Sequence, residues 1–461
     1  MTIAPKHPGR LNLKKRLLSG GAWVLGGFVV NAFAGLVVTA LLTRILAPAE
    51  VGLYFLAFSL VITGSGLIQI GLNRSVVRLT AEAMTLNQPR RARDTIGKAL
   101  LLVAVLGGIV ALMLNTGAGR ELVDAAFPKS DIGHYLLALS IWLGASALRS
   151  LTAESFRGLH DYRMAALGQR ILPNILLAGA LTVIWLDGTG FTIGEVFFLA
   201  AAIALIVFAG TGLLLLRRVI HYSGDESIAY PRILHSSLPL FISQALALAM
   251  AQAPIWILGA TQPEVEIANF GTAMRLAMIT SMPLLVANNV IQPTVASLYS
   301  ADEHTRLSRV MSASVALISL PAILLFLVFA LGGTEILTFL FGRPYGDAHA
   351  TLVILSAGLL INVLSGSATV ALAMSGHERH VLKSAASAAF ISVAASIVLV
   401  PRYGAEGAAF AASLGLVMYN ALLCWHSKAI LGLKTYIRPA GFMELVRLVR
   451  QQAANLANNP K

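Results

Sequence analysis

The sequence predicts an all-α integral membrane protein with twelve transmembrane helices in two related six-helix lobes. Three observations predict it: an apolar composition, twelve separate apolar segments, and the placement of Lys and Arg between them. Hydrophobic residues make up 57% of the 461 residues and charged residues only 12%. The mean hydropathy is +0.77. Soluble domains carry roughly 25% charged residues, so this chain cannot supply the surface of a soluble fold.

The twelve segments are defined by length and apolar content. A spanning helix needs about 20 mostly apolar residues. The first segment follows a basic tail, as a signal peptide would, but it exceeds the roughly 7–15 apolar residues of a signal sequence. We therefore expect it to be a retained helix. The segments are 18–43, 52–73, 99–117, 134–153, 165–186, 195–216, 238–260, 269–298, 310–333, 349–374, 383–400 and 407–427.

The basic residues test the number and direction of these segments. With the N-terminus in the cytoplasm, 28 of the 34 Lys and Arg fall on the inner side and 6 on the outer side. The acidic residues divide evenly, 10 inside and 11 outside. An excess of Lys and Arg alone is the signature of cytoplasmic loops. A missed or invented helix would scramble this alternation, so we expect an even number of spans with both termini inside.

A short motif near the start of the second segment recurs in the second half. Glu50–Leu60 aligns with Glu266–Leu276 at a shift of 216 residues. Weaker echoes, of Ser155–Arg163 near Ala373–Val381 and of the DGTG stretch near YGAEG, keep nearly the same offset. An acidic, a small and an aromatic residue define the motif: Glu50, Gly52 and Tyr54 in the first copy, softened to Glu266, Ala268 and Phe270 in the second.

The repeat divides the chain into two halves of six segments. Because six is even, both halves have the same orientation and are related by an axis along the membrane normal. A tail segment with helical spacing, Met443–Leu456, is either an amphipathic helix on the inner membrane face or a frayed end. The expected parts are an inner tail 1–17, a first lobe 18–216, an inner loop 217–237, a second lobe 238–427 and a basic inner tail 428–461.

Five stretches of the chain carry a family resemblance. In order and spacing they resemble the Wzx-like O-antigen and exopolysaccharide flippases of the multidrug/oligosaccharidyl-lipid/polysaccharide (MOP) exporter superfamily, which also contains the MATE exporters. The resemblance covers nearly the whole chain. The stretches are TRILAPAEVGLYFLAFSL, GLNRSVVRL, IQPTVASLY, LTFLFGRPYGDAHATLVILSAGLLIN and YGAEGAAFAASLG.

The resemblance implies a function and a location. A member of this family moves an undecaprenyl-diphosphate-linked oligosaccharide from the inner to the outer leaflet of the bacterial inner membrane, by alternating access between its lobes. The implied partners are that lipid-linked oligosaccharide, membrane lipids, and polysaccharide polymerase and chain-length proteins. No cofactor is implied.

Arginine suits the diphosphate of such a substrate, because its guanidinium stays charged and binds phosphate through a fork of donors. Arg170 is the first candidate, nine residues beyond Asp161 and about 14 Å along a helix; a side chain reaching back to the inner surface is the alternative. Arg275 is the second, with an ion pair to Glu264 or Glu266 as the alternative.

Three more arginines lie near expected inner helix ends: Arg74, Arg78 and Arg149. They can attract an anionic substrate to an inward-facing mouth, although anchoring of the helix ends is the favoured interpretation. Arg44 lies in the outer turn before the motif, and we expect it to pair with Glu50 or lipid headgroups.

Amide side chains within the segments are candidates for binding sugar hydroxyls. Amides at helix–helix contacts are the alternative for each of them. Spacings of eight and four place two pairs near one helix face each. The candidates are Asn31, the pair Gln244 and Gln252, and the pair Asn288 and Gln292.

Other functions fit the sequence less well. No Asp or Glu lies deep in any expected segment, which disfavours a cation-coupled multidrug exporter and leaves the energy source open. The outer loops are too short for a polymerase or glycosyltransferase. The basic residues form no single patch, so nucleic acid is not an expected partner. His377 and His380 lack further metal ligands nearby, and a single Cys424 excludes an internal disulfide.

Overall fold

The computed structural model describes residues 10–188, 190–224 and 226–438, with side chains from residue 26 onward except at 28, 239, 243 and 293. The expected tail segment Met443–Leu456 lies outside this range. The described residues form helices and no strand. The helices of the first half are α1 Arg10–Ile45, α2 Pro48–Ile68, α3 Leu72–Thr85, α4 Pro89–Leu114, α5 Gly117–Ala126, η1 Asp131–Tyr135, α6 Leu136–Gly158, α7 Tyr162–Ala166, η2 Leu167–Ile171, α8 Leu172–Asp187 and α9 Ile193–Val219. Those of the second half are α10 Tyr230–Thr261, α11 Glu264–Ala277, η3 Met278–Ser281, α12 Met282–Ser300, α13 His304–Phe341, η4 Arg343–Ala348, α14 His349–Ser365, α15 Ala368–Met374 and α16 Glu378–Leu431.

Ten of the described helices are long and apolar enough to cross a membrane. A further apolar stretch, Val29–Ile45, belongs to α1. Large apolar side chains face outward, with Leu331 84%, Phe339 78% and Phe390 75% exposed. Such a surface is suited to hydrocarbon rather than water. The expected fold class, an all-α multi-pass membrane protein, is confirmed.

The longest helix, α16, is a hairpin rather than one rod. Ser384 Oγ lies 3.4 Å from His426 Nδ1, 42 residues away, whereas a straight helix would separate them by about 63 Å. The chain reverses at Gly404, whose φ of 52° and ψ of −130° are not helical. The two arms correspond to the expected segments 383–400 and 407–427. With α1 they bring the apolar segments to the expected twelve; the number that spans the bilayer and the cytoplasmic position of the termini stay predictions.

The reversal in α16 is stabilised by the second copy of the motif. Glu266 Oε2 accepts a hydrogen bond of 2.7 Å from the backbone N–H of Ala405, at the start of the second arm. A carboxylate at a helix N-terminus is favoured by the helix dipole and by the unpaired N–H groups there. A Cβ at Gly404 would overlap the Glu266 carboxylate, so this position needs glycine for both its backbone angles and its space.

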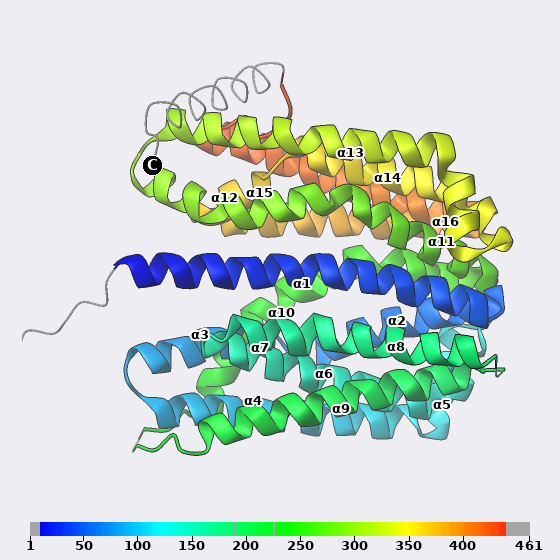
Figure 1. The fold of residues 1–461 in the computed structure, drawn as a ribbon, viewed down its shortest axis with the longest axis horizontal. Coiled ribbons are helices and arrows are strands. Elements are labelled where there is room, and N and C mark those ends of the chain that lie inside the picture. The colour runs from blue at the N-terminus through cyan, green and yellow to red at the C-terminus, as the bar shows by residue number, and fades with distance from the viewer. Residues whose placement is uncertain (1–9, 189, 225, 439–461) are drawn as a thin grey trace, which may run out of the picture.

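The helices form two groups (Figure 1). The helices α2–α9 make one group and α11–α16 the other, and α1 runs along the boundary between them. Helix α10 packs against α16 of the second group and against α2 and α3 of the first. This arrangement agrees with two lobes, while the lobe limits 18–216 and 238–427 stay a prediction.

The two motif copies pack against each other where α2 and α11 meet. Gly52 lies against the backbone of Glu264, and Gly271 lies against the ring of Phe55; a Cβ at either glycine would overlap these neighbours. Small residues allow transmembrane helices to approach closely. The repeat found in the sequence therefore forms a direct contact between the two halves.

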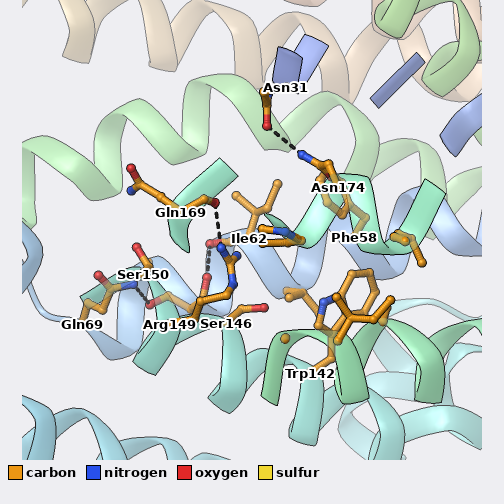
Figure 2. A pocket seen from close by; sticks show the side chains of 18 of the residues that line it. Asn31, Phe58, Ile62, Gln69, Trp142, Ser146, Arg149, Ser150, Gln169 and Asn174 are labelled. Carbon is orange, nitrogen blue, oxygen red and sulfur yellow. Dashed lines mark hydrogen bonds between the residues drawn. The ribbon is translucent and has the colours of Figure 1, made fainter. Parts of the chain in front are cut away.

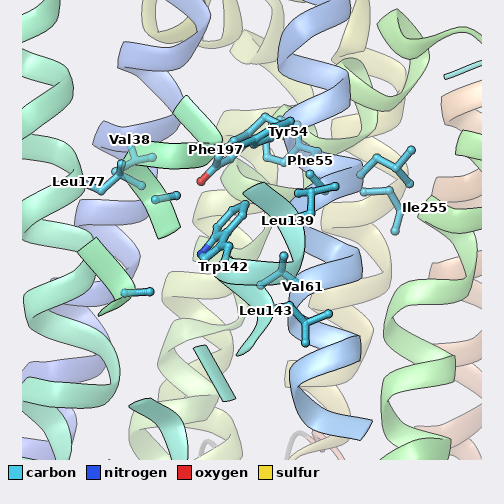
Figure 3. Packing of buried hydrophobic residues seen from close by; sticks show 14 of the residues in the cluster. Val38, Tyr54, Phe55, Val61, Leu139, Trp142, Leu143, Leu177, Phe197 and Ile255 are labelled. Atoms are coloured by element: carbon cyan, nitrogen blue, oxygen red, sulfur yellow. The ribbon is translucent and has the colours of Figure 1, made fainter. Parts of the chain in front are cut away.

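An aromatic cluster holds the core of the first group together (Figure 3). The Trp142 ring of α6 lies 6.1 Å from Tyr54, 6.1 Å from Phe58 and 6.3 Å from Phe197, measured between ring centroids. These separations are typical of favourable aromatic pairs. Tyr54 is only 2% exposed, so the aromatic residue of the motif is a core residue that joins α2 to α6.

Candidate functional site

A cavity of about 340 Å³ lies within the first group of helices (Figure 2). Residues of α1, α2, α3, α6, α8, α9 and α10 line it, together with η2. The α6 wall consists of residues spaced by four, seven and eight positions, which place them on one helix face. They are Trp142, Ser146, Arg149 and Ser150.

Arg149 is the charged group of this wall. It lies nine residues before the end of α6 at Gly158, so it is not near the helix end where the sequence analysis placed it. Its Nη1 donates hydrogen bonds to the carbonyl oxygens of Gly168 at 2.9 Å and Gln169 at 2.7 Å. Its Nε is buried without a hydrogen-bond partner, and no described carboxylate forms an ion pair with it. The positive charge therefore remains available to a ligand.

The two carbonyls are available because the helix they belong to is irregular. Leu167–Ile171 is a π-helical turn, in which the Leu172 N–H bonds to the Leu167 carbonyl five residues back. Pro173 follows and has no N–H to donate. The turn therefore leaves carbonyl oxygens unpaired, and Arg149 satisfies two of them. Single π-turns inside α-helices are frequent at functional sites.

A buried carboxylate supports the same turn. Glu154 of α6 is 8% exposed and accepts hydrogen bonds from Arg157, at 2.8 and 3.0 Å, and from Gln169 Nε2 at 3.0 Å. Gln169 Oε1 also accepts a 3.2 Å hydrogen bond from Arg157. Glu154 lies one residue beyond the expected segment 134–153, but α6 continues to Gly158, so this carboxylate belongs to the helix.

A second cavity, of about 680 Å³, lies between the two groups of helices. Gln169 lines both cavities, so they share a wall. The second cavity brings together Arg170 and Arg157 of the first group with Asn289 and Gln292 of α12. Arg170, the first candidate from the sequence, therefore faces an interior space. No described carboxylate is among the residues that line it.

Arg275 lies outside both cavities but close to the first. Its guanidinium carbon is 5.0 Å from the centroid of the Phe58 ring, a cation–π contact, and Phe58 lines the first cavity. The alternative of an ion pair to Glu264 or Glu266 is wrong. Glu264 accepts hydrogen bonds from Ser130 and Asp131, and Glu266 caps the arm of α16.

The amide candidates separate into two sets. Asn31 and Gln244 line the first cavity, where Asn31 accepts a 2.7 Å hydrogen bond from Asn174 and Gln244 accepts one of 2.9 Å from Asn73. Gln292 lines the second. The other two line neither.

Gln252 and Asn288 make their contacts elsewhere. Gln252 Oε1 accepts a 2.7 Å hydrogen bond from Ser59 of α2, a contact between helices. Asn288 Oδ1 is buried without a partner. Each expected pair is therefore divided between the wall of a cavity and a different environment.

The remaining candidates lie on the surface or in contacts between helices. Arg74 and Arg78 are exposed on α3. Arg44 does not pair with Glu50: its Nη2 donates to the Phe339 carbonyl of α13 at 3.2 Å, while Glu50 accepts a 3.0 Å hydrogen bond from the Ala47 N–H at the start of its own helix. The expected pairing with Glu50 is wrong because Glu50 caps α2, while the alternative partner, lipid headgroups, stays a prediction.

Comparison with known proteins identifies the family. The family described as "Polysaccharide biosynthesis protein" matches residues 17–299, more than half of the chain. The chain belongs to this family. It is also 20% identical over 418 residues to a "Putative O-antigen transporter" of Shigella flexneri, covering 89% of this chain and 97% of that protein.

Solved structures show the same fold. An inward-facing multidrug resistance MATE transporter of the MOP superfamily superposes with a TM-score of 0.71 at 16% identity, covering 87% of this chain and 94% of the other. The lipid II flippase MurJ, in an inward closed conformation, gives 0.70 at 14% identity, covering 94% and 92%. This polysaccharide biosynthesis protein therefore shares the fold of these MOP-superfamily structures, and its ten long apolar helices agree with a multi-pass membrane protein.

In this family member, sequence reasoning missed several residues that the fold brings to the cavities. Gln169 adjoins Arg170 in the chain, and Glu154 lies one residue past an expected segment end. A helical-face count on α6 from Arg149 would have found Trp142, Ser146 and Ser150. Among the described residues, no group of three or more His, Cys, Asp and Glu is placed to hold a metal ion.

Proposed function

We propose that this transporter moves an undecaprenyl-diphosphate-linked oligosaccharide from the inner to the outer leaflet by alternating access. The observation that carries the proposal is Arg149, a cavity-facing guanidinium without a described carboxylate partner. An unpaired charge inside a membrane protein is costly and is usually retained for function. A diphosphate entering the cavity would supply the missing negative charge.

The second cavity supports the same substrate class. Arg170 and Arg157 line it, and the nearby carboxylate of Glu154 is held by Arg157 and Gln169. A diphosphate moving between the two cavities would pass Gln169 and stay within reach of arginine. The positive lining would repel cationic drugs, which argues against a multidrug exporter with this fold.

We expect the contact between α2 and α11 to open and close during alternating access. Gly52 and Gly271 hold the two halves together on the side of the expected outer turns, while the second cavity lies between the halves elsewhere. Opening of this contact, with closure around the second cavity, would expose the substrate to the opposite leaflet.

A deletion strain tests the proposal. We expect the polysaccharide repeat unit to accumulate on undecaprenyl diphosphate in the inner leaflet. The wild-type gene should restore surface polysaccharide, and Arg149→Ala should not, at equal membrane abundance. Arg120→Ala is the matched control, because Arg120 is half exposed on α5 and pairs with Asp124. Absence of the carrier-linked unit, together with lost efflux of a cationic dye, would contradict the proposal.

A further inference from the structure

The first cavity contains polar atoms that no protein group satisfies. Gln69 is only 3% exposed, and its Oε1 is buried without a hydrogen-bond partner, although its Nε2 donates to the Ser65 carbonyl at 3.0 Å. Buried polar atoms in native proteins are nearly always hydrogen-bonded. An acceptor left unpaired in a cavity wall indicates a ligand that donates a hydrogen bond.

Two hydroxyls of the cavity wall are also without partners. Thr152 and Ser155 of α6 donate to the carbonyls four residues back, as hydroxyls in membrane helices commonly do. Ser146 and Ser150, on the cavity face of the same helix, make no hydrogen bond within the described part of the chain. Each hydroxyl can both donate and accept.

An aromatic ring completes this wall. Trp142 is 7% exposed and lines the cavity beside Phe58. Its indole N–H has no acceptor among the described residues, and in Figure 2 the indole lies on the cavity side of α6. Trp142 therefore offers an apolar face and a hydrogen-bond donor at once.

These features distinguish between the parts of the proposed substrate. At neutral pH all the oxygens of a diphosphate are hydrogen-bond acceptors. It therefore has no donor for the unpaired acceptor Gln69 Oε1. A sugar ring carries hydroxyls that donate and accept, together with C–H faces that pack on an aromatic ring. The mixed set of donors, acceptors and aromatic surface in a cavity of about 340 Å³ fits a small ligand of that kind.

We infer that the first cavity is a sugar subsite, in which Gln69, Ser146, Ser150 and Trp142 bind a sugar of the repeat unit. The diphosphate is held at the junction of the two cavities, where Arg149 contacts Gln169 and Gln169 borders the cavity of Arg170. The inference rests on the proposed function and adds to it: the polar and aromatic residues of the first cavity bind the sugar, and the arginines bind the diphosphate.

Binding to two defined lipids tests the subsite. The probes are undecaprenyl diphosphate alone and undecaprenyl diphosphate carrying the repeat unit extracted from the deletion strain, each titrated into the purified full-length protein. We expect Gln69→Met and Ser150→Ala to weaken binding of the glycosylated lipid about tenfold, as loss of a buried hydrogen bond does. Binding of the bare lipid should not change, whereas Arg149→Ala should weaken both.

Matched variants control for folding. Ser155→Ala removes a buried hydroxyl on the opposite side of α6, and Trp185→Phe changes a lipid-exposed tryptophan; both should bind like the wild type. Trp142→Phe should weaken binding of the glycosylated lipid as Ser150→Ala does. If Trp142→Phe does not fold, Gln69→Met and Ser150→Ala decide the result.

The outcomes separate the two proposals. Equal weakening of both lipids by Gln69→Met and Ser150→Ala, or no weakening of either, would overturn the sugar subsite while leaving the flippase proposal intact. Failure of the wild-type protein to bind either lipid would overturn the proposed function itself.

Discussion

Gly52 of α2 lies against the backbone carbonyl of Glu264, at the first residue of α11. The two residues are 212 positions apart: Gly52 belongs to the first copy of the short motif, and Glu264 lies two residues before the second copy. The contact joins the two halves of the chain through backbone rather than through long side chains. Such a contact can separate and re-form without breaking an ion pair.

Gly52→Ala should therefore interfere with closure of the two halves. The added methyl group would overlap the Glu264 carbonyl, and overpacking of this kind costs about 1–3 kcal/mol. We expect a lower midpoint of thermal unfolding in detergent and reduced export. Gly108→Ala is the control, because nothing lies within 4 Å of a Cβ there and alanine favours helix. Equal behaviour of the two variants would argue against a close contact at Gly52.

Arg149 donates hydrogen bonds to two carbonyls of the π-helical turn before Pro173. We therefore expect substitutions of Arg149 and Pro173 to have coupled effects on stability. Arg149→Met leaves the Gly168 and Gln169 carbonyls unpaired, which should destabilise the protein by about 1–3 kcal/mol. Pro173→Ala returns a backbone N–H to that turn. The double variant should therefore lose less stability than the sum of the single variants, measured by unfolding in detergent. Strict additivity would mean that Arg149 does not compensate for the proline.

Glu266 should be needed for the hairpin of α16. Glu266→Ala removes the carboxylate that accepts from Ala405, and loss of such a cap costs about 0.5–2 kcal/mol. We expect a lower unfolding midpoint for this variant, and no change for Glu335→Ala, whose side chain is exposed on α13. An unchanged midpoint in Glu266→Ala would exclude the capping role.

The orientation is tested by reporter fusions. A fusion after Leu216, near the end of α9, should report the cytoplasm, and one after Gly188, just past α8, should report the periplasm. The physical reason is the retention of Lys and Arg on the inner side. The opposite pattern would refute the inward position of the termini, and equal signals at both sites would refute the span between them.

Composition and charge spacing were sufficient for the fold class because they report how the chain distributes between hydrocarbon and water. Each apolar segment is a local property, and so is the glycine that ends a helix. Even the hairpin in α16 was foreseeable, since Pro401 and Gly404 interrupt the apolar run between segments 383–400 and 407–427. The motif at Glu50 and its second copy at Glu266 were also visible in the sequence. The contact between the two copies was not.

The site depended on contacts between segments distant in the chain. Arg149 was expected to anchor a helix end because it lies four residues before the expected segment end at 153. Its position in the structure follows from the unpaired carbonyls of Gly168 and Gln169, which no local pattern on α6 reports. Glu154 was missed for a similar reason, because its burial is due to Gln169 on the next helix.

The sequence by itself determined that this is a membrane protein with two related halves, because hydropathy, basic-residue placement and repetition are properties of the chain. Only the tertiary structure decided which arginines face a cavity and which amides bind neighbouring helices. Those assignments depend on which helix lies opposite, as Gln252 bonded to Ser59 and Gln69 left unpaired show. Packing, not position along the chain, determines whether a buried polar group is satisfied by the protein or left for a substrate.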